Sequence, residues 1–189
     1  MSYRLFCFLG NPGTQYSRTR HNVGRMVEAS IPGSRAFQKK FKGRFAKEGQ
    51  SYFLLPETYM NKSGESVSAC ADYFSIDPGE ILVVHDETEL PLGEVQLKAG
   101  GGTAGHNGLK SISHQLGTPE FHRFRLGVGR PARGSLSSYV LSAFAPEETP
   151  VLERLLEESG RILDDLVARR DSPRLQSIES GERVTLVER

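Results

Sequence analysis

Apolar runs alternate with amphipathic stretches along the 189-residue chain, which predicts strands that alternate with helices. Short apolar or alternating runs predict strands at residues 3–9, 50–55, 80–85, 94–98 and 124–128. Helices are expected at residues 22–29, 63–74, 107–116 and 147–170, where apolar side chains recur at the spacing of one buried face. This alternation is typical of an α/β fold. We therefore expect a single domain over residues 1–189, with a central mixed β-sheet flanked by helices.

Two stretches give no clear prediction of an element. Residues 37–47 are basic with interleaved aromatic side chains, and the tail after Ser172 is mostly polar without a clear period. Residues 100–105 are predicted to form a flexible glycine-rich loop before the helix at 107–116.

The composition is that of a globular protein, with 37% hydrophobic and 25% charged residues. It is too balanced for a disordered chain. The longest apolar runs are too short to span a bilayer, and the N-terminus lacks the pattern of a signal peptide. Cys7 and Cys70 stand at apolar positions without a CxxC pair, so we expect buried thiols and a reduced, cytoplasmic location.

Positive charge is concentrated near the N-terminus, although the net charge of the whole chain is only +1. Residues 1–62 hold eleven Lys and Arg against three acidic residues. A basic front half favours a polyanionic partner. The alternative is a solvated charged face, so this signal alone does not decide.

Polar clusters follow predicted strands or precede predicted helices, which is where sites form in open α/β sheets. The cluster after residues 3–9 contains Asn11, Tyr16 and His21. Histidine titrates near neutral pH, so His21 is suited to take a proton from water; the alternative is a surface histidine beside a turn. At the end of the strand at 80–85, Asp86 could hold an imidazole in one tautomer.

The second cluster, residues 85–91, follows the strand at 80–85. A metal site is its rival interpretation, because acidic residues follow His85 closely. Strand alternation, however, points His85 and Asp86 to opposite sides. The chain also lacks HExxH or a similar pair of ligands. We therefore expect no metal and no cofactor.

The third cluster contains the pattern GxGxxG at Gly100, Gly102 and Gly105. A dinucleotide site is rejected because the preceding strand is short and alternating rather than buried. A P-loop would need Lys followed by Ser or Thr. The remaining interpretation is a loop that brings its backbone and Asn107 close to a ligand. The fourth cluster, residues 58–64, is by itself a turn with a helix cap.

The clusters together provide a base, a carboxylate and several amide side chains. They include no serine or cysteine nucleophile in a recognisable elbow. This set of groups favours hydrolysis by an activated water molecule.

Several segments, in order, resemble the signature segments of bacterial peptidyl-tRNA hydrolases. They are residues 9–16 (LGNPGTQY), 19–24 (TRHNVG), 59–64 (YMNKSG), 85–87 (HDE), 105–110 (GHNGLK) and 121–129 (FHRFRLGVG). The resemblance extends from residue 3 to about residue 170. It implies a monomer without cofactor that acts in the cytoplasm on peptidyl-tRNA and releases peptide and free tRNA.

The resemblance also implies roles for individual residues. It puts the catalytic base at His21 and its supporting carboxylate at Asp86. It gives Asn11 the recognition of the peptide backbone and the rejection of unblocked aminoacyl-tRNA, and Asn107 the holding of the attacking water and contact with the substrate. The other positions for substrate or tRNA binding are Tyr16, Tyr59, Met60, Asn61, Lys98, His106 and Arg125.

The chain departs from the family pattern at three places. Residues 86–91 read DETELP where DELDLP is usual, Thr103 and Ala104 replace a usual His-Gly pair, and Tyr59 stands where Phe is common. None of these changes the proposed base or its carboxylate. The departures bear on loop flexibility and rate rather than on the reaction.

Two surfaces compete for the tRNA phosphates. We favour the cations near the glycine loop, with Lys98 and Arg125 marked by the resemblance, over the basic run at 35–47. The favoured group comprises Lys98, Lys110, Arg123, Arg125 and Arg130.

Two other function classes remain as alternatives. A non-catalytic RNA-binding protein on the same fold is disfavoured by the presence of both His21 and Asp86. A metalloesterase would need a ligand cluster, which the sequence does not show.

Overall fold

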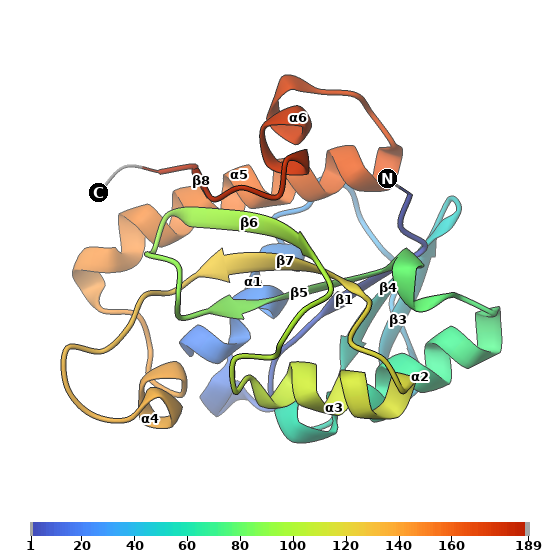
Figure 1. Cartoon of the computed structure of the whole chain (residues 1–189), viewed down its shortest axis with the longest axis horizontal. Helices are drawn as coiled ribbons and strands as arrows, with labels where there is room; N and C mark the ends of the chain where they lie inside the picture. Colours follow the sequence, from blue (N-terminus) through green and yellow to red (C-terminus); the bar gives the residue numbers. More distant parts are fainter. Residues whose placement is uncertain (1, 188–189) are drawn as a thin grey trace.

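One mixed sheet of eight strands forms the centre of the computed structural model, which describes residues 2–187. The strand order is β2-β3-β4-β1-β5-β7-β6-β8 (Figure 1). The central strands β4, β1, β5 and β7 run parallel, and the outer strands pair antiparallel. The α/β class and the mixed sheet are therefore confirmed. The strands span Leu5–Phe8 (β1), Gln38–Lys40 (β2), Gly43–Glu48 (β3), Ser51–Pro56 (β4), Ile81–Glu87 (β5), Glu94–Ala99 (β6), His122–Gly127 (β7) and Val184–Thr185 (β8).

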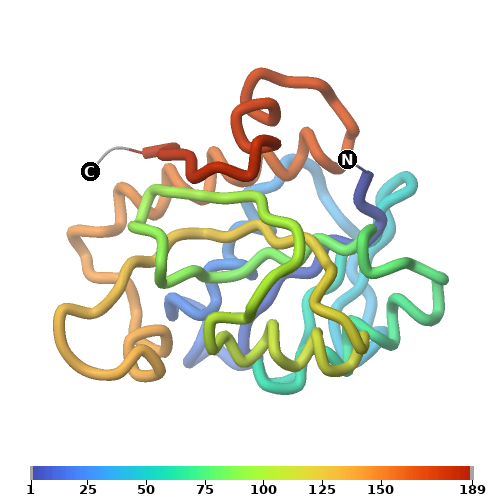
Figure 2. Tube along the Cα trace, viewed as in Figure 1, coloured from blue at the N-terminus to red at the C-terminus, as the bar shows by residue number. Residues whose placement is uncertain are grey.

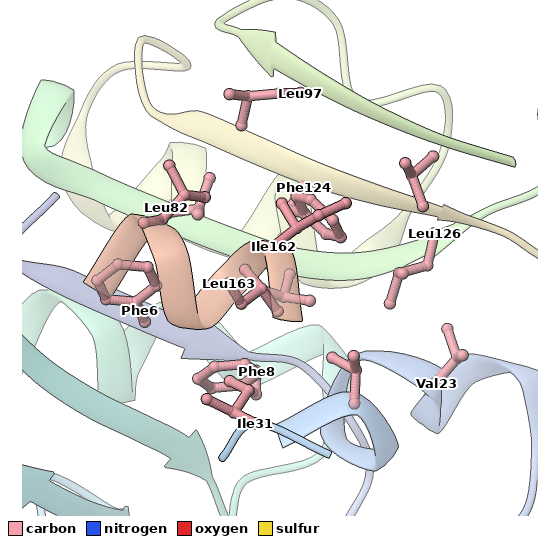
Figure 3. Close-up of a cluster of buried hydrophobic side chains, with 14 of the residues drawn as sticks. Phe6, Phe8, Val23, Ile31, Leu82, Leu97, Phe124, Leu126, Ile162 and Leu163 are labelled. Carbon is pink, nitrogen blue, oxygen red and sulfur yellow. The ribbon is translucent and has the colours of Figure 1, made fainter. Parts of the chain in front are cut away.

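Helices cover both faces of the sheet because side chains alternate along its strands. In β1, Phe6 and Phe8 pack in a core with helices α1, α5 and α6, and Figure 3 shows part of that core. Leu5 and Cys7 pack in a second core with α2 and α3. The helices span Val23–Glu28 (α1), Ser63–Phe74 (α2), Asn107–Leu116 (α3), Leu136–Val140 (α4), Thr149–Ala168 (α5) and Pro173–Glu179 (α6). No helix among the described residues has both the length and the apolar content to cross a membrane.

The basic stretch at 37–47, which predicted no element, forms the hairpin of β2 and β3. Its turn holds Phe41 and Lys42 in the left-handed region, at φ 55° and 52°. Such turns normally contain Asn and Gly, so the sequence carries no turn signal here. The turn is instead held from outside, because Ser66 Oγ donates to the Phe41 carbonyl at 2.6 Å and the Glu57 N–H donates to the Lys42 carbonyl at 2.9 Å.

The tail after Ser172, which also predicted no element, contains α6 and β8. The Ser172 hydroxyl accepts from the Leu175 N–H at 3.1 Å, and Pro173 occupies the first turn. Leu175 and Ile178 are the buried residues of α6. An apolar stripe of two residues is too short to reveal a helical period in the sequence.

The parallel strands β4, β1 and β5 end at the same edge of the sheet. The turns that follow β1 and β4 are therefore neighbours of the last residues of β5. Residues 100–106 lead from β6 across the strands to the start of α3 (Figure 2). Four sequence clusters that lie far apart in the chain thus meet in one region.

Candidate active site

Three ionisable side chains meet at the edge where β1 and β5 end. His21 lies in a short 3₁₀ turn before α1, Asp86 near the end of β5, and His106 just before α3. Gly24 allows the close approach of α1, since a Cβ atom there would lie 2.4 Å from the Val84 carbonyl oxygen. The glycine in the segment at 19–24 thus helps to bring His21 against the end of β5.

Asp86 accepts hydrogen bonds from two imidazole rings. His21 Nδ1 lies 2.9 Å from both carboxylate oxygens, and His106 Nε2 lies 2.8 Å from Oδ1. The residue is only 2% exposed. Burial alone would raise the pKa of Asp86, but His106 and His21 hold that pKa well below its usual range. The structure therefore brings together the predicted pair of His21 and Asp86, with Asp86 as a carboxylate.

The second ring nitrogen of His21 is the one left for chemistry, because Nδ1 is engaged with Asp86. His21 is largely buried and borders a cavity of about 170 Å³. Thr88, residues 103–107 and one side of α4 also line this cavity. A small pocket beside an unengaged imidazole nitrogen suits a water molecule and a carbonyl group.

His106 makes two kinds of contact that the sequence did not predict. Its Nδ1 accepts from the backbone N–H groups of Gly108 and Leu109, at 3.1 and 3.3 Å, and so caps α3. Since Nδ1 must offer a lone pair to these donors, the proton of the neutral ring lies on Nε2 and is donated to Asp86. Both ring nitrogens of His106, a predicted binding residue, are therefore engaged within the protein.

His85 lies beside this group in a fully buried position. Its Nδ1 donates to the Asp86 carbonyl at 2.7 Å, and its ring meets the His106 ring edge-on at a centroid distance of 5.0 Å. Its Nε2 is buried without a hydrogen-bond partner among residues 2–187. Burial and the neighbouring His106 hold the pKa of His85 well below its usual range. His106 thus contacts both His85 and Asp86, which alternation predicted to face opposite sides.

Asn11 is oriented by its neighbours. Its side-chain Oδ1 accepts from the Met60 N–H at 2.7 Å, while the Asn22 side chain pairs with its backbone N–H and carbonyl at 2.9 and 3.0 Å. The side-chain Nδ2 is therefore the atom that Asn11 can offer to a substrate, and it can only donate. Met60 is itself buried, and its backbone N–H orients Asn11.

The glycine loop is tied to the sheet by Arg123. This buried guanidinium donates to the carbonyls of Gly101 and Gly102, both at 2.6 Å. Arg123 was expected among the cations for tRNA, but these bonds turn it towards the loop. Ala104 lies in the left-handed region at φ 47°, where the resemblance would have glycine. Asn107, the first residue of α3, is exposed and lines the cavity.

The other predicted contacts lie around this centre at different depths. Tyr59 is 57% exposed and Asn61 is also exposed, both beside the turn that precedes α2. Tyr16 is half-buried in the turn after β1. None of the three borders the cavity beside His21.

The two cations marked for tRNA phosphates differ in their surroundings. Lys98 is exposed at the end of β6. Arg125 is half-buried and forms an ion pair with Glu87 at 2.6 Å, and it also contacts Gln96. The charge of Arg125 is therefore already balanced, whereas Lys98 forms no ion pair with a described residue.

The rival basic surface at 35–47 retains more unpaired cations. Arg35 is paired with Glu48 at 2.7 Å and Lys42 with Glu65 at 2.6 Å. Lys39, Arg44 and Lys47 form no ion pair within residues 2–187, although Arg44 and Lys47 lie over aromatic rings. Both surfaces therefore retain, among the described residues, cations without an ion pair that are available to a polyanion.

The wall of the cavity formed by α4 is anchored next to His21. The buried guanidinium of Arg20 pairs with both carboxylate oxygens of Glu148, at 3.1 and 2.7 Å. The same group lies against the rings of Tyr139 and Phe144, at 4.3 and 4.6 Å from their centroids. The position of α4 over the cavity is therefore coupled to the turn that carries His21, which the sequence did not reveal.

Among the described residues, the group that could hold a metal is His21, Asp86 and His106, whose ligand atoms lie within 4.8 Å of one another, and not the cluster at His85 that the sequence suggested. A metal bound to His106 Nε2 would move the ring proton to Nδ1. That proton would then face the N–H groups of Gly108 and Leu109, and the cap of α3 would be lost. The donor pattern therefore fits hydrogen bonds to Asp86 better than a metal ion.

Comparison with known proteins gives one consistent result. The family model for peptidyl-tRNA hydrolase matches residues 5–184. A peptidyl-tRNA hydrolase of Lactobacillus delbrueckii subsp. bulgaricus is 40% identical over 181 residues, which cover 92% of this chain and 98% of that protein. One from Gloeobacter violaceus is 43% identical over 178 residues, with 89% and 90% covered.

The fold has a close counterpart among solved structures. A crystal structure of peptidyl-tRNA hydrolase from Acinetobacter baumannii superposes with a TM-score of 0.83 at 32% identity. The match covers 95% of this chain and 96% of that chain. The similarity therefore extends over the whole sheet and its helices, not over the site alone.

Proposed function

This chain belongs to the peptidyl-tRNA hydrolase family and hydrolyses the ester of peptidyl-tRNA, and from that premise we propose that His21 is the general base of the reaction. The observation that carries the proposal is the hydrogen bond between His21 Nδ1 and Asp86, at 2.9 Å. It leaves Nε2 for a water molecule and sets a buried negative charge behind the ring. This is the relation between base and carboxylate in hydrolase triads.

The reaction then proceeds by attack of water on the ester carbonyl between peptide and tRNA. As the water oxygen bonds to the carbonyl carbon, His21 Nε2 takes its proton and Asp86 stabilises the imidazolium. Collapse of the tetrahedral intermediate breaks the bond to the ribose oxygen of the tRNA, which takes the proton from His21. The products are free peptide and free tRNA, and His21 returns to its neutral form.

Amide side chains provide the polar contacts of this mechanism. Asn107 borders the cavity at the amino end of α3, where it can hold the water and donate to the developing oxyanion. Asn11 Nδ2 is a donor, so its partner in the substrate is a carbonyl oxygen. A blocked substrate has that carbonyl on its α-amino group, whereas an unblocked one presents a charged ammonium that Asn11 cannot pair.

The tRNA contributes most of the binding through its phosphates. Lys98 is our leading phosphate contact because it is exposed and forms no ion pair with the part of the chain that the structure describes. Arg125 remains a proposed contact, but it would have to exchange Glu87 for a phosphate. Tyr59 and Asn61, which are exposed, and Tyr16 are proposed to contact the tRNA or the peptide of the substrate.

Compartment and assembly state are part of the proposal. A cytoplasmic location is supported by the two free, buried cysteines. The monomeric state remains a prediction from the family resemblance. A non-catalytic RNA-binding role is disfavoured by the ordered pair of His21 and Asp86.

The test is release of the acyl group from N-acetyl-aminoacyl-tRNA, with unblocked aminoacyl-tRNA as the control substrate. We expect His21→Ala to lower the rate by roughly 10²–10⁴-fold, which is the usual contribution of a positioned base. The fold should persist, because His21 lies in a turn at the rim of the core. Turnover at the wild-type level in His21→Ala would exclude this mechanism. Activity lost to a chelator would support the metalloesterase instead.

A further inference from the structure

We propose that His106 is a positioning residue of the reaction, and that the amino end of α3 holds its ring as a neutral donor to Asp86. The negative charge of Asp86 is then reserved for His21. The sequence-based expectation gave His106 a role in binding the substrate or tRNA. The proposal rests on His21 acting as the base.

The tautomer of His106 follows from its two sets of contacts. Nδ1 accepts from Gly108 N–H and Leu109 N–H, and Nε2 lies 2.8 Å from Asp86 Oδ1. Only the neutral ring with its proton on Nε2 satisfies both ends. A second proton on Nδ1 would point at two N–H donors and at the positive end of the α3 dipole. The helix thus opposes the cationic form of His106.

Among the described residues, the ring of His21 has a hydrogen-bond partner at one nitrogen only. Its Nδ1 donates to Asp86, and its Nε2 makes no hydrogen bond with a described residue. The two rings lie close together, at a centroid distance of 4.9 Å. The same carboxylate therefore holds two imidazoles, and the start of α3 determines which of them can become the cation.

The other charged or titratable groups described around Asp86 make no hydrogen bond or ion pair with its carboxylate. On β5, His85 donates to the Asp86 carbonyl, and Glu87 is paired with Arg125 of β7. Arg123 of β7 is bonded to the loop carbonyls. The α4 residues that line the cavity, Leu136, Ser137 and Val140, carry no charge. The partition of the Asp86 charge is thus between His21 and His106.

The deciding variant is His106→Asn. Asparagine is among the preferred N-cap residues, so α3 should start as before. Its amide ends near the position of Nδ1, however, and does not extend to Asp86 as Nε2 does. The variant therefore separates the capping of α3 from the bond to Asp86, and His106→Ala, which lacks both, is its matched control.

We expect His106→Asn to melt close to the wild type and to bind peptidyl-tRNA with little change in KM. Its kcat should fall roughly tenfold, because Asp86 and His21 are held less firmly. The acid limb of its pH–rate profile should move to higher pH, since Asp86 without its second donor stabilises the imidazolium formed on His21 more strongly. A raised KM with an unmoved acid limb would assign His106 to substrate binding and overturn the proposal. Wild-type kinetics would overturn it too.

An independent readout comes from nitrogen NMR of the wild-type protein labelled with ¹⁵N-histidine. We expect His106 Nδ1 to stay unprotonated over the pH range in which His21 gains its proton. Protonation of both rings over the same range would overturn the proposal. His21→Ala, measured in parallel for turnover, tests the base itself, so a failure of the proposed function is distinguishable from a failure here.

Discussion

Acid should weaken the fold through His85 before it protonates the carboxylates. The ring of His85 is 1% exposed, donates from Nδ1 to the Asp86 carbonyl, and leaves Nε2 without a partner among the described residues. Burial and His106 hold its pKa well below the ordinary value of 6.5. A cation at this position would lie inside the core, and no described residue accepts a hydrogen bond from its Nε2.

The direction in which pH changes the stability follows from comparing proton binding by His85 in the folded and unfolded states. Below the ordinary pKa the unfolded chain binds a proton at His85, whereas the folded protein does not, so stability is lost as the pH falls from that value. With an unfolded pKa of 6.5, one such histidine reduces the free energy of unfolding by about 1.2 kcal/mol between about pH 7 and about pH 5.5. The depressed pKa of Asp86 acts in a separate window, because its contribution is lost only below its ordinary value of 3.8.

The assay is urea unfolding of the wild type and of His85→Asn at the two pH values. The asparagine amide can replace the Nδ1 donor, and it does not titrate. The wild type should lose about 1.2 kcal/mol more than the variant. Any packing defect in the variant cancels, because only the change with pH is compared. His122, whose pKa is also lowered by partial burial, contributes equally to both proteins. Equal losses in the two proteins would refute a neutral, buried His85.

Three further perturbations test the site and its loop. Asn11→Asp keeps the acceptor for the Met60 N–H but removes the donor, so selectivity for blocked over unblocked aminoacyl-tRNA should fall about tenfold or more; unchanged selectivity in a competition assay would contradict the role of Asn11. Ala104→Gly should raise the melting temperature by about 2–4 °C, because it relieves roughly 1 kcal/mol of left-handed strain, and a lower melting temperature would count against that strain. Lys98→Ala should raise KM and flatten the log–log salt slope by about 0.9, with Lys39→Ala as the matched control; a smaller slope in the control alone would move the tRNA to the other surface.

The regular elements were predictable because their signals are local. The stripe of Val67, Cys70 and Ala71 predicted α2 at the residues where it occurs. The hairpin of β2 and β3 was not, because its turn is held by partners on α2 and after β4 rather than by turn residues. Its conformation depends on contacts that exist only after the sheet has formed. A single sequence read locally has no signal for such a turn.

The residues of the site also differ in how far the sequence could predict their position and contacts. The family segments singled out His21 and Asp86 as candidates, and the parallel pairing of β1 with β5 explains why they meet. The tRNA cations were less predictable, since a lysine or arginine in the sequence does not reveal its partner. Arg125 has Glu87 and Arg123 has the loop carbonyls, whereas Lys98 forms no ion pair within residues 2–187. Charge counted along the chain therefore overestimates the charge that a substrate meets.

His106 combines a local and a long-range role. Its bonds to Gly108 and Leu109 span two and three residues, so a histidine before a helix is a signal that local reasoning could have found. Its bond to Asp86 spans 20 residues and depends on the packing of α3 against the sheet. That packing is close, because a Cβ atom at Gly108 would lie 2.8 Å from the Leu9 side chain. Gly108 thus allows α3 to pack closely, and the packed helix orients His106. The ring of His106 in turn holds the Asp86 carboxylate that contacts His21. A substitution at Gly108 should therefore act on the rate through this chain of contacts, although Gly108 does not line the cavity.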